Sequence, residues 1–366
     1  MSTLLVTGAA GFIGTNFVYS WQRRHPSDVI VVLDALTYAG NRDNLAPIID
    51  DDGIQFVRGD ICDEALVTKL FDKHKFDVVV HFAAESHVDR SIVAPDAFIR
   101  TNVVGTHALL KAALTAWNGE YKGRRFHHVS SDEVYGSLGP NDPPFMETSP
   151  YDPRSPYAAS KAGSDFLVKA YGHTYGLPVT VSNSSNNYGP FQFPEKLIPL
   201  TLLNALMGRA LPIYGDGMNV RDWIYVDDHC AALATVLERG RVGQTYNIGG
   251  GNEIPNIELV NLLCGFIDDR VRGDHKLAAR FPDCPAGKGG SCRELISYVK
   301  DRPGHDRRYA INNNKINDEF GTVPLRPITE GLPKTLDWYL ANEPWWRRIQ
   351  SGDYRNWIAS QYGLTL

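Results

Sequence analysis

The start of the chain constrains its fold more than any other feature. An apolar run at Leu4–Thr7 leads into GAAGFIG at 8–14, and a helical pattern over Ile13–Arg24 follows. Three glycines in GxxGxxG spacing allow a tight turn, close approach of the backbone to a pyrophosphate, and close helix–strand packing. The N–H groups at the helix start favour anions. A plain turn is the alternative, but this context predicts a dinucleotide-binding strand–turn–helix unit.

Short apolar runs alternate with longer helical patterns through the first half of the chain. Such alternation predicts an α/β fold, a Rossmann-like, doubly wound parallel sheet covered on both faces. The predicted strands are Leu4–Thr7, Val29–Leu33, Gln55–Val57, Val78–Phe82, Phe126–Ser130 and Val179–Ser182. The predicted helices are Ile13–Arg24, Glu64–Lys73, Asp96–Trp117 and Pro156–Tyr175.

The composition changes after about residue 185, where glycine, proline, asparagine and aromatic residues become more frequent. We expect a dinucleotide-binding domain at 1–185, with Arg221–Leu237 and Gln244–Gly249 (near 221–250) returning to its sheet. Residues 186–366 are expected to form mainly a smaller, mixed substrate-binding region, since loops on a rigid scaffold carry specificity. Arg270–Arg293 is interpreted as a surface excursion, and WWRR at 345–348 as a helix with solvated arginines.

Composition excludes several classes of protein. The 366 residues suggest about two domains. A net charge of −5 argues against a nucleic-acid partner, and no apolar run reaches the roughly 18 residues of a membrane helix. The first residues predict a strand rather than a signal peptide. Five cysteines without CxxC spacing favour neither a disulfide framework nor a metal site, which fits a reducing cytoplasm.

Two aspartates bear on the cofactor. Asp34 ends the second predicted strand, 20 residues beyond Gly14. A carboxylate there can accept hydrogen bonds from ribose hydroxyls and would repel a 2′-phosphate, which favours NAD over NADP. A helix N-cap is the alternative role. Asp60 is expected either to hold the adenine amino group or to cap the helix that starts near Glu64.

Tyr157 and Lys161 stand at i and i+4, so a helix places them on one face. The lysine charge is expected to lower the pKa of the phenol, giving a base that accepts an alcohol proton while hydride leaves the carbon. A YxxxK pair alone is common on surface helices. Together with the glycine-rich turn, it indicates a dehydrogenase-type site.

Longer motifs carry a family resemblance over almost the whole chain. They are DALTYAGN (34–41), AAESHVDRSI (83–92), SSDEVYG (130–136), SPYAASKAGSD (155–165), NNYGPFQFPEKLIP (186–199), YGDGMNVRDWIYVDDH (214–229) and DRPGHDRRYA (301–310). With these motifs the chain resembles the extended short-chain dehydrogenases/reductases, and among them the nucleotide-sugar 4,6-dehydratases. The resemblance implies a hydro-lyase with tightly held NAD and favours dTDP-glucose as substrate, with UDP- and GDP-sugars as alternatives.

The resemblance also implies site residues at the matching positions. The cofactor is expected to contact Gly8, Gly11, Phe12, Ile13, Gly14, Asp34, Leu36, Thr37, Asp60, Ile61, Ala83, Ala84, Ser86, Asn102, Tyr157, Lys161 and Asn186. The nucleotide sugar is expected to contact Ser86, His87, Ser131, Asn187, Glu195, Lys196, Leu197, Pro212, Tyr214, Arg221, Asn252 and His305. Taken alone, Tyr214 is equally typical of a core or turn, His305 of a solvated surface, and His87 of a loop oriented by an Asp89–Arg90 pair.

Asp132 and Glu133 follow the fifth predicted strand, at the sheet edge where ligands bind. Two carboxyls beyond the tyrosine and lysine suggest extra proton transfers, whereas a solvated turn is the alternative. The resemblance implies that Tyr157 takes the C4 hydroxyl proton, Glu133 removes the C5 proton and Asp132 protonates the departing C6 hydroxyl. Ser131 replaces the family's usual threonine but keeps the hydroxyl that polarises the C4 oxygen.

Rival functions remain open on the sequence alone. An epimerase or decarboxylase of the same scaffold has no use for the two carboxyls, and a non-enzymatic NAD sensor would not need Tyr157 and Lys161. The family further implies a homodimer through the helices Asp96–Trp117 and Pro156–Tyr175. Their outward faces are expected to be apolar, unless these side chains face their own sheet: Val103, Ala108, Leu110, Ala112, Phe166, Leu167 and Ala170.

Overall fold

The computed structural model describes residues 1–49, 53–322 and 324–350, and a seven-stranded parallel sheet forms its centre. The strand order is β10-β6-β5-β4-β1-β2-β3. Along β1, Leu4 and Val6 enter the core on one face while Leu5 enters the core on the other, so both faces are buried. The predicted doubly wound α/β fold is confirmed. The strands are β1 (Thr3–Thr7), β2 (Val29–Asp34), β3 (Ile54–Arg58), β4 (Val78–His81), β5 (Arg125–Ser131), β6 (Val179–Ser184) and β10 (Thr245–Ile248).

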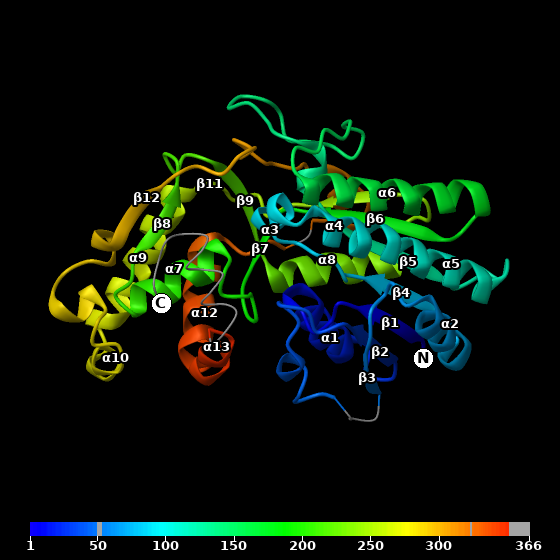
Figure 1. Cartoon of the computed structure of the whole chain (residues 1–366), viewed down its shortest axis with the longest axis horizontal. Coiled ribbons are helices and arrows are strands. Elements are labelled where there is room, and N and C mark those ends of the chain that lie inside the picture. The colour runs from blue at the N-terminus through cyan, green and yellow to red at the C-terminus, as the bar shows by residue number, and fades with distance from the viewer. Residues whose placement is uncertain (50–52, 323, 351–366) are drawn as a thin grey trace.

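Helices cover both faces of this sheet (Figure 1). One layer contains α2 (Glu64–His74), α5 (Thr106–Trp117) and α6 (Pro156–Tyr175), whose apolar residues share a core with β1 and β5. The other layer contains α1 (Phe12–Arg24), α8 (Val226–Arg239) and α11 (Asn314–Phe320). Because all strands run the same way, their carboxyl ends form one edge.

The segment predicted as a helix at Asp96–Trp117 is helical throughout, but its middle part is a π-helix. After α3 (Val88–Val93) come α4 (Pro95–Phe98), the π-helical segment η2 (Ile99–Gly105) and α5. The Thr106 hydroxyl donates to the carbonyl of Asn102 at 2.5 Å. Such back-bonding competes with the backbone ladder and bends helices, which accounts for the irregular turn.

The prediction that these helices have apolar outward faces is partly wrong. Ala108, Leu110 and Ala112 are buried, and Leu110 and Ala112 pack in the core beneath the sheet. Phe166 and Ala170 of α6 are exposed as expected, and the exposed apolar side chains also include Ile99 and Val104 of η2 and Tyr175 of α6.

The second lobe has its own core and two small sheets (left in Figure 1). The three-stranded sheet has the order β11-β9-β7, and β12 pairs with β8. The strands are β7 (Asn186–Tyr188), β8 (Leu211–Tyr214), β9 (Val220–Tyr225), β11 (Glu253–Pro255) and β12 (Ile296–Val299). The helices are α7 (Leu197–Leu206), α9 (Asn256–Arg272), α10 (His275–Arg280), α12 (Ile328–Ala341) and α13 (Glu343–Ile349).

Two expectations for this half are corrected. Residues 221–225 lie in β9 of the small sheet, so within 221–250 the chain rejoins the large sheet through α8 and β10. Arg270–Arg293 is not a plain surface excursion, because α10 and the 3-10 turns η4 (Pro285–Lys288) and η5 (Cys292–Leu295) bury apolar side chains in the second core. In α13, Trp346 is fully buried and both arginines are exposed, as predicted.

The predicted second region extends over 351–366, which lies outside the described residues. Across the described part of the chain, no helix is both long and apolar enough to span a membrane. All five cysteines are free, and the Sγ atoms of Cys284 and Cys292 lie 3.6 Å apart.

Candidate active site

A cavity of about 350 Å³ opens at the carboxyl edge of the large sheet. It lies against the ends of β1, β2, β4, β5 and β6, and residues 192–196 of the second lobe close one side. The structure brings most of the sequence-predicted residues to this cavity. They are Gly8, Gly11, Phe12, Ile13, Gly14, Asp34, Thr37, Asp60, Ile61, Ala83, Ala84, Ser86, Ser131, Asp132, Glu133, Tyr157, Lys161, Asn186, Asn187, Glu195 and Lys196.

The glycine-rich turn leaves room for a ligand because side chains cannot fit there. Gly8 has φ +70°, and a Cβ on it would lie 2.6 Å from backbone atoms of Ala83. A Cβ on Gly14 would lie 2.6 Å from the carbonyl oxygen of Gly8. Helix α1 begins after Gly11 without a side-chain cap, which leaves its first N–H groups to a ligand. The turn therefore fits a pyrophosphate.

Asp34 and Asp60 both line this end of the cavity. Asp34 accepts from the backbone N–H of Ala10 at 2.9 Å and of Leu36 at 2.8 Å, so it does not cap a helix. Burial raises the pKa of Asp34, and these two hydrogen bonds oppose the rise. Asp60 does not cap α2 either, because the N-cap is Asp63. Leu36 itself does not line the cavity.

The cavity also contains an unused buried acceptor. Among the described residues, the side-chain oxygen of Asn186 is buried with no hydrogen-bond partner. A buried polar atom without a partner is costly unless a ligand satisfies it. Together with the turn and Asp34, this atom shows that the predicted residues suit a dinucleotide.

Tyr157 and Lys161 lie one turn apart on α6, which begins at Pro156 and is capped by the Ser155 side chain. The Lys161 ammonium donates to the carbonyl of Val129 at 2.8 Å. Burial lowers the pKa of Lys161 to about 8. Burial raises the pKa of Tyr157, carboxylates including Glu133 raise it further, and a hydrogen bond with Ser131 opposes them. The pKa of Tyr157 is thus raised, whereas the sequence predicted that it would be lowered.

Ser131, Asp132 and Glu133 stand where β5 turns into the 3-10 helix η3 (Asp132–Tyr135). Asp132 is buried, so the solvated-turn interpretation is wrong for it. Burial raises the pKa of Asp132 well above its usual value, and the charges of Glu133 and Asp222 add to this. Burial also raises the pKa of Glu133, but nearby cations oppose it. The pair therefore contains a carboxyl that retains its proton beside one that loses it more easily.

The cations around Glu133 come from distant segments. Its pKa is lowered by Arg302, Arg221 and Lys196, in that order. The Arg221 guanidinium lies 4.3 Å from the centre of the Tyr309 ring and donates to the carbonyls of Val220 and Asp306. Arg302 was not among the predicted site residues, and its only signal in the sequence is its place in DRPGHDRRYA.

His305 and Tyr214 lie beside these arginines. The rings of Tyr214 and His305 meet edge to face at 6.0 Å. His305 Nδ1 is 2.7 Å from Asp301, and burial with the charges of Arg302 and Arg221 lowers its pKa to about 4. Only 5% of its side chain is exposed, which excludes a solvated surface histidine.

Glu195 is the centre of a buried cluster. Its carboxylate lies 3.6 Å from His87 and 3.6 Å from Arg90, and it shares a hydrogen bond with the phenol of Tyr38. Burial raises the pKa of Glu195. Tyr38 also lines the cavity and was missed, although it lies within DALTYAGN.

The Asp89–Arg90 pair expected beside His87 is wrong. Asp89 lies 3.6 Å from Arg302, whereas Arg90 stacks on the ring of Tyr38 at 3.8 Å. Asp89 thus ties the loop after β4 to the segment that carries Arg302 and His305.

Several predicted residues lie away from the cavity. The predicted contact of Asn252 with the nucleotide sugar is corrected, because backbone groups satisfy its side chain. Its amide donates to the carbonyls of Trp223 and Gly250, and its oxygen accepts from the N–H of Ile328. Asn102 pairs with the backbone of Glu85 and fixes the loop after β4. The remaining ones are Leu36, His87, Leu197, Pro212, Tyr214, Arg221 and His305.

Comparison with known proteins gives consistent matches. The family model described as GDP-mannose 4,6 dehydratase matches residues 5–335. A protein of Xanthomonas campestris pv. campestris named dTDP-glucose 4,6-dehydratase is 53% identical over 359 residues, 97% of this chain and 98% of that protein. A Streptomyces venezuelae dTDP-glucose 4,6-dehydratase, solved with NAD bound, is 45% identical with a TM-score of 0.84, covering 95% and 99% of the two chains.

A solved UDP-glucose 4-epimerase of Thermotoga maritima is more distant. It is 27% identical, with a TM-score of 0.78 over 93% of this chain and 99% of that one. The scaffold is therefore shared between dehydratases and epimerases, and the residues of the site must distinguish them.

Proposed function

The chain belongs to the nucleotide-sugar dehydratases that the GDP-mannose 4,6 dehydratase model describes, and we propose that it converts dTDP-glucose to dTDP-4-keto-6-deoxyglucose and water. This makes it a hydro-lyase of deoxysugar biosynthesis. The observation that carries the proposal is the meeting of Asp132 and Glu133 with Tyr157 and Lys161 at one cavity.

The cofactor is NAD. The glycine turn would hold the pyrophosphate, Asp34 would accept from the ribose hydroxyls, and Asp60 would hold the adenine amino group. NAD+ supplies a hydride acceptor and later returns the hydride, so net chemistry is water elimination. Asn102 lies away from the cavity and supports this site by fixing the loop that carries Glu85.

The protein's own groups move the protons. Tyr157, assisted by Lys161, accepts the C4 hydroxyl proton, and Ser131 hydrogen-bonds the C4 oxygen. The C4 ketone acidifies the C5 hydrogen, which Glu133 removes. Asp132 donates its proton to the C6 hydroxyl, which leaves as water, and a proton returns to C5 when the hydride reaches C6.

The nucleotide sugar lies between the two lobes' loops. Arg221, Arg302 and His305 hold the diphosphate, since an arginine can bind phosphate oxygens through two N–H groups. Glu195, Lys196, Asn187 and Ser86 surround the hexose. Tyr214, with Pro212 beside it, stacks on the base.

The chain is proposed to work as a homodimer in the cytoplasm. The exposed apolar side chains of η2 and α6, Ile99, Val104, Phe166 and Tyr175, form the proposed dimer face. Burying such side chains would offset the cost of association.

An epimerase of the same scaffold is the second candidate, which the fold supports but the two carboxyls disfavour. Incubating the purified protein with dTDP-, UDP- and GDP-linked glucose, and measuring the product masses by mass spectrometry, distinguishes a dehydratase from an epimerase. We expect dTDP-glucose to lose the mass of one water molecule. A product of unchanged mass with inverted C4 would refute dehydration, and preferred turnover of another nucleotide would refute the base assignment.

A further inference from the structure

On helix α6, two further charged side chains follow Tyr157 and Lys161 along the same face. Tyr157, Lys161, Asp165 and Lys169 follow one another at i, i+4, i+8 and i+12, so their side chains share one face of the helix. Neighbours at this spacing have Cβ atoms about 5–6 Å apart. The proton transfers proposed above use only the first two members of the stripe.

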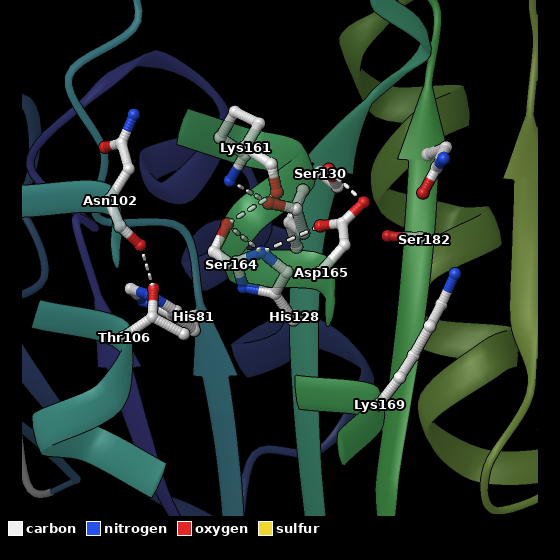
Figure 2. Close-up of polar contacts among 12 residues, drawn as sticks. His81, Asn102, Thr106, His128, Ser130, Lys161, Ser164, Asp165, Lys169 and Ser182 are labelled. Atoms are coloured by element: carbon white, nitrogen blue, oxygen red, sulfur yellow. Dashed lines mark hydrogen bonds and ion pairs between the residues drawn. The ribbon is translucent and has the colours of Figure 1, made fainter. Parts of the chain in front are cut away.

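Asp165 is fully buried behind Lys161. One of its oxygens accepts from the Ser130 hydroxyl at 2.9 Å and from the Tyr151 hydroxyl at 2.9 Å. The other lies 3.2 Å from Nε2 of His128. Figure 2 shows this carboxyl between Ser130 and His128.

The groups that contact the Asp165 carboxylate directly carry no positive charge at neutral pH. Burial, with the charge of Lys161, lowers the pKa of His128 well below its usual value, so the imidazole carries no charge at neutral pH. Ser130 and Tyr151 are neutral donors. Hydrogen bonds from Ser130 and Tyr151 and the charges of Lys161 and Lys169 favour the ionised carboxylate, and the pKa of Asp165 is about 6, raised by burial.

Lys161 in turn has little else to stabilise its charge. It is buried, and its ammonium donates to one neutral carbonyl, that of Val129. Asp165 is the group whose charge raises the pKa of Lys161 against burial. A buried ammonium without a counter-charge loses its proton or its position.

We propose that the Asp165 carboxylate is a positioning residue, the counter-charge that keeps the Lys161 ammonium protonated and in place next to Tyr157. Asp165 then acts on catalysis through Lys161 and touches neither substrate nor cofactor. The inference rests on the proposed function in one respect, namely that Lys161 serves Tyr157 as a cation.

Other titratable groups face Asp165 and enter any pH effect. They come from β4, β5, η3, α6 and the loop before it, and they are His81, His128, Tyr135, Tyr151, Tyr157, Lys161 and Lys169. His81 and His128 both have a pKa well below the usual value because of burial, so neither titrates near neutrality. The three tyrosines have a raised pKa. Lys161 and Asp165 are therefore the groups that titrate between about pH 6 and 8.

The test is Asp165→Asn in the full-length protein, with lysines labelled by carbon-13 at Cε and titrated by NMR. The Lys161 signal is assigned by its loss in Lys161→Met. We expect the Lys161 midpoint to fall by about one unit or more, a tenfold change in its protonated-to-neutral ratio. Asn keeps an oxygen to accept from Ser130 and Tyr151, so a purely structural acceptor would leave the midpoint unchanged, and that result overturns the proposal.

A second measurement needs no variant and covers the case that Asp165→Asn does not fold. In the parent protein the Lys161 signal should show an additional small inflection near the pH where Asp165 takes up its proton. A single inflection would refute the pairing. Asp268→Asn is the matched control, because Asp268 is a buried carboxylate of the second lobe that accepts from Ser291 and Cys292. It should leave the Lys161 titration unchanged.

Activity gives the last readout. In Asp165→Asn, single-turnover oxidation of the nucleotide sugar should slow at least tenfold at pH 8 with KM nearly unchanged, and the loss should be smaller at lower pH. An equal loss at every pH would refute a role through Lys161. Failure of the parent to dehydrate any nucleotide sugar would refute the proposed function instead, because the titrations require no substrate.

Discussion

Replacing Glu133 with glutamine should separate oxidation of the substrate from loss of water. Glutamine has nearly the same shape and leaves intact the backbone N–H that donates to the Ser131 hydroxyl at 3.3 Å. Tyr157 and Lys161 are untouched, so the C4 hydroxyl can still lose its proton and hydride. The C5 proton then has no base to accept it. Asp132→Asn should stall the same elimination by withholding the proton from the C6 hydroxyl.

The structure sets the size and the pH dependence of these defects. A positioned general acid or base contributes typically 10²- to 10⁴-fold, or about 3–5 kcal/mol, so each variant should lose roughly that much turnover. Burial raises the pKa of both carboxyls, and more for Asp132. Glu133 works ionised, so elimination appears as pH rises through its pKa. Asp132 works protonated, so elimination disappears as pH rises through its higher pKa.

The two carboxyls titrate as a pair, so the expected profile is a bell with two apparent values. Asp132→Asn should remove the alkaline limb and leave the acid limb. The double variant should lose little more than either single variant, because both groups serve one step.

Rapid mixing with dTDP-glucose measures the separation directly. In Glu133→Gln, NADH absorbance should rise at the parent rate or faster, because the charge of Glu133 raises the pKa of Tyr157, and it should persist instead of decaying. The C5 hydrogen should not exchange with deuterium from solvent. Tyr157→Phe is the matched control, in which NADH should not form. Full dehydratase turnover in Glu133→Gln, or a parent rate of oxidation in Tyr157→Phe, would refute the division of labour.

Three further predictions concern binding and assembly. Asp34→Asn should weaken NAD binding by roughly 1–3 kcal/mol, the scale of a charged hydrogen bond, measured by calorimetry, and release of NADP(H) from the denatured parent would contradict the assignment. Arg302→Gln should raise KM for the nucleotide sugar about 10- to 100-fold, and an unchanged KM would place the diphosphate elsewhere. The parent should sediment as a dimer at micromolar concentration and Phe166→Glu as a monomer, whereas a monomeric parent would refute the proposed dimer face.

Local patterns were enough to predict the large sheet and its cofactor turn. β1, β2 and β4 are near-continuous apolar runs, and Gly8 and Gly14 occupy positions where a side chain would collide with backbone. Periodicity could not show that Thr106 would bend its helix, because a hydroxyl fits a regular helix equally well in sequence. The cap of α2 was missed for a similar reason: Asp60 and Asp63 both precede the helix, and only the backbone path selects Asp63.

The substrate side of the site was harder to predict, because its charged residues interact with partners that are far apart in the sequence. Asp89 was expected to pair with its neighbour Arg90, yet it meets Arg302, and Arg90 is drawn instead to Tyr38 and Glu195. Such pairings follow from how loops of two lobes meet, which no local pattern contains. Arg302 was missed although its motif was noticed.

Tyr157 shows most clearly why a correct motif does not settle the chemistry. The i, i+4 spacing correctly placed a cation one turn away, but burial and the carboxylates raise the pKa of the phenol instead of leaving it lowered. The same carboxylates that make dehydration feasible therefore oppose the first proton transfer. The cation one turn from Tyr157, Lys161, is itself buried, and burial lowers its own pKa. A fixed anion behind Lys161 is one way for the fold to keep that charge, which explains why a carboxylate as buried as Asp165 lies directly behind the catalytic pair.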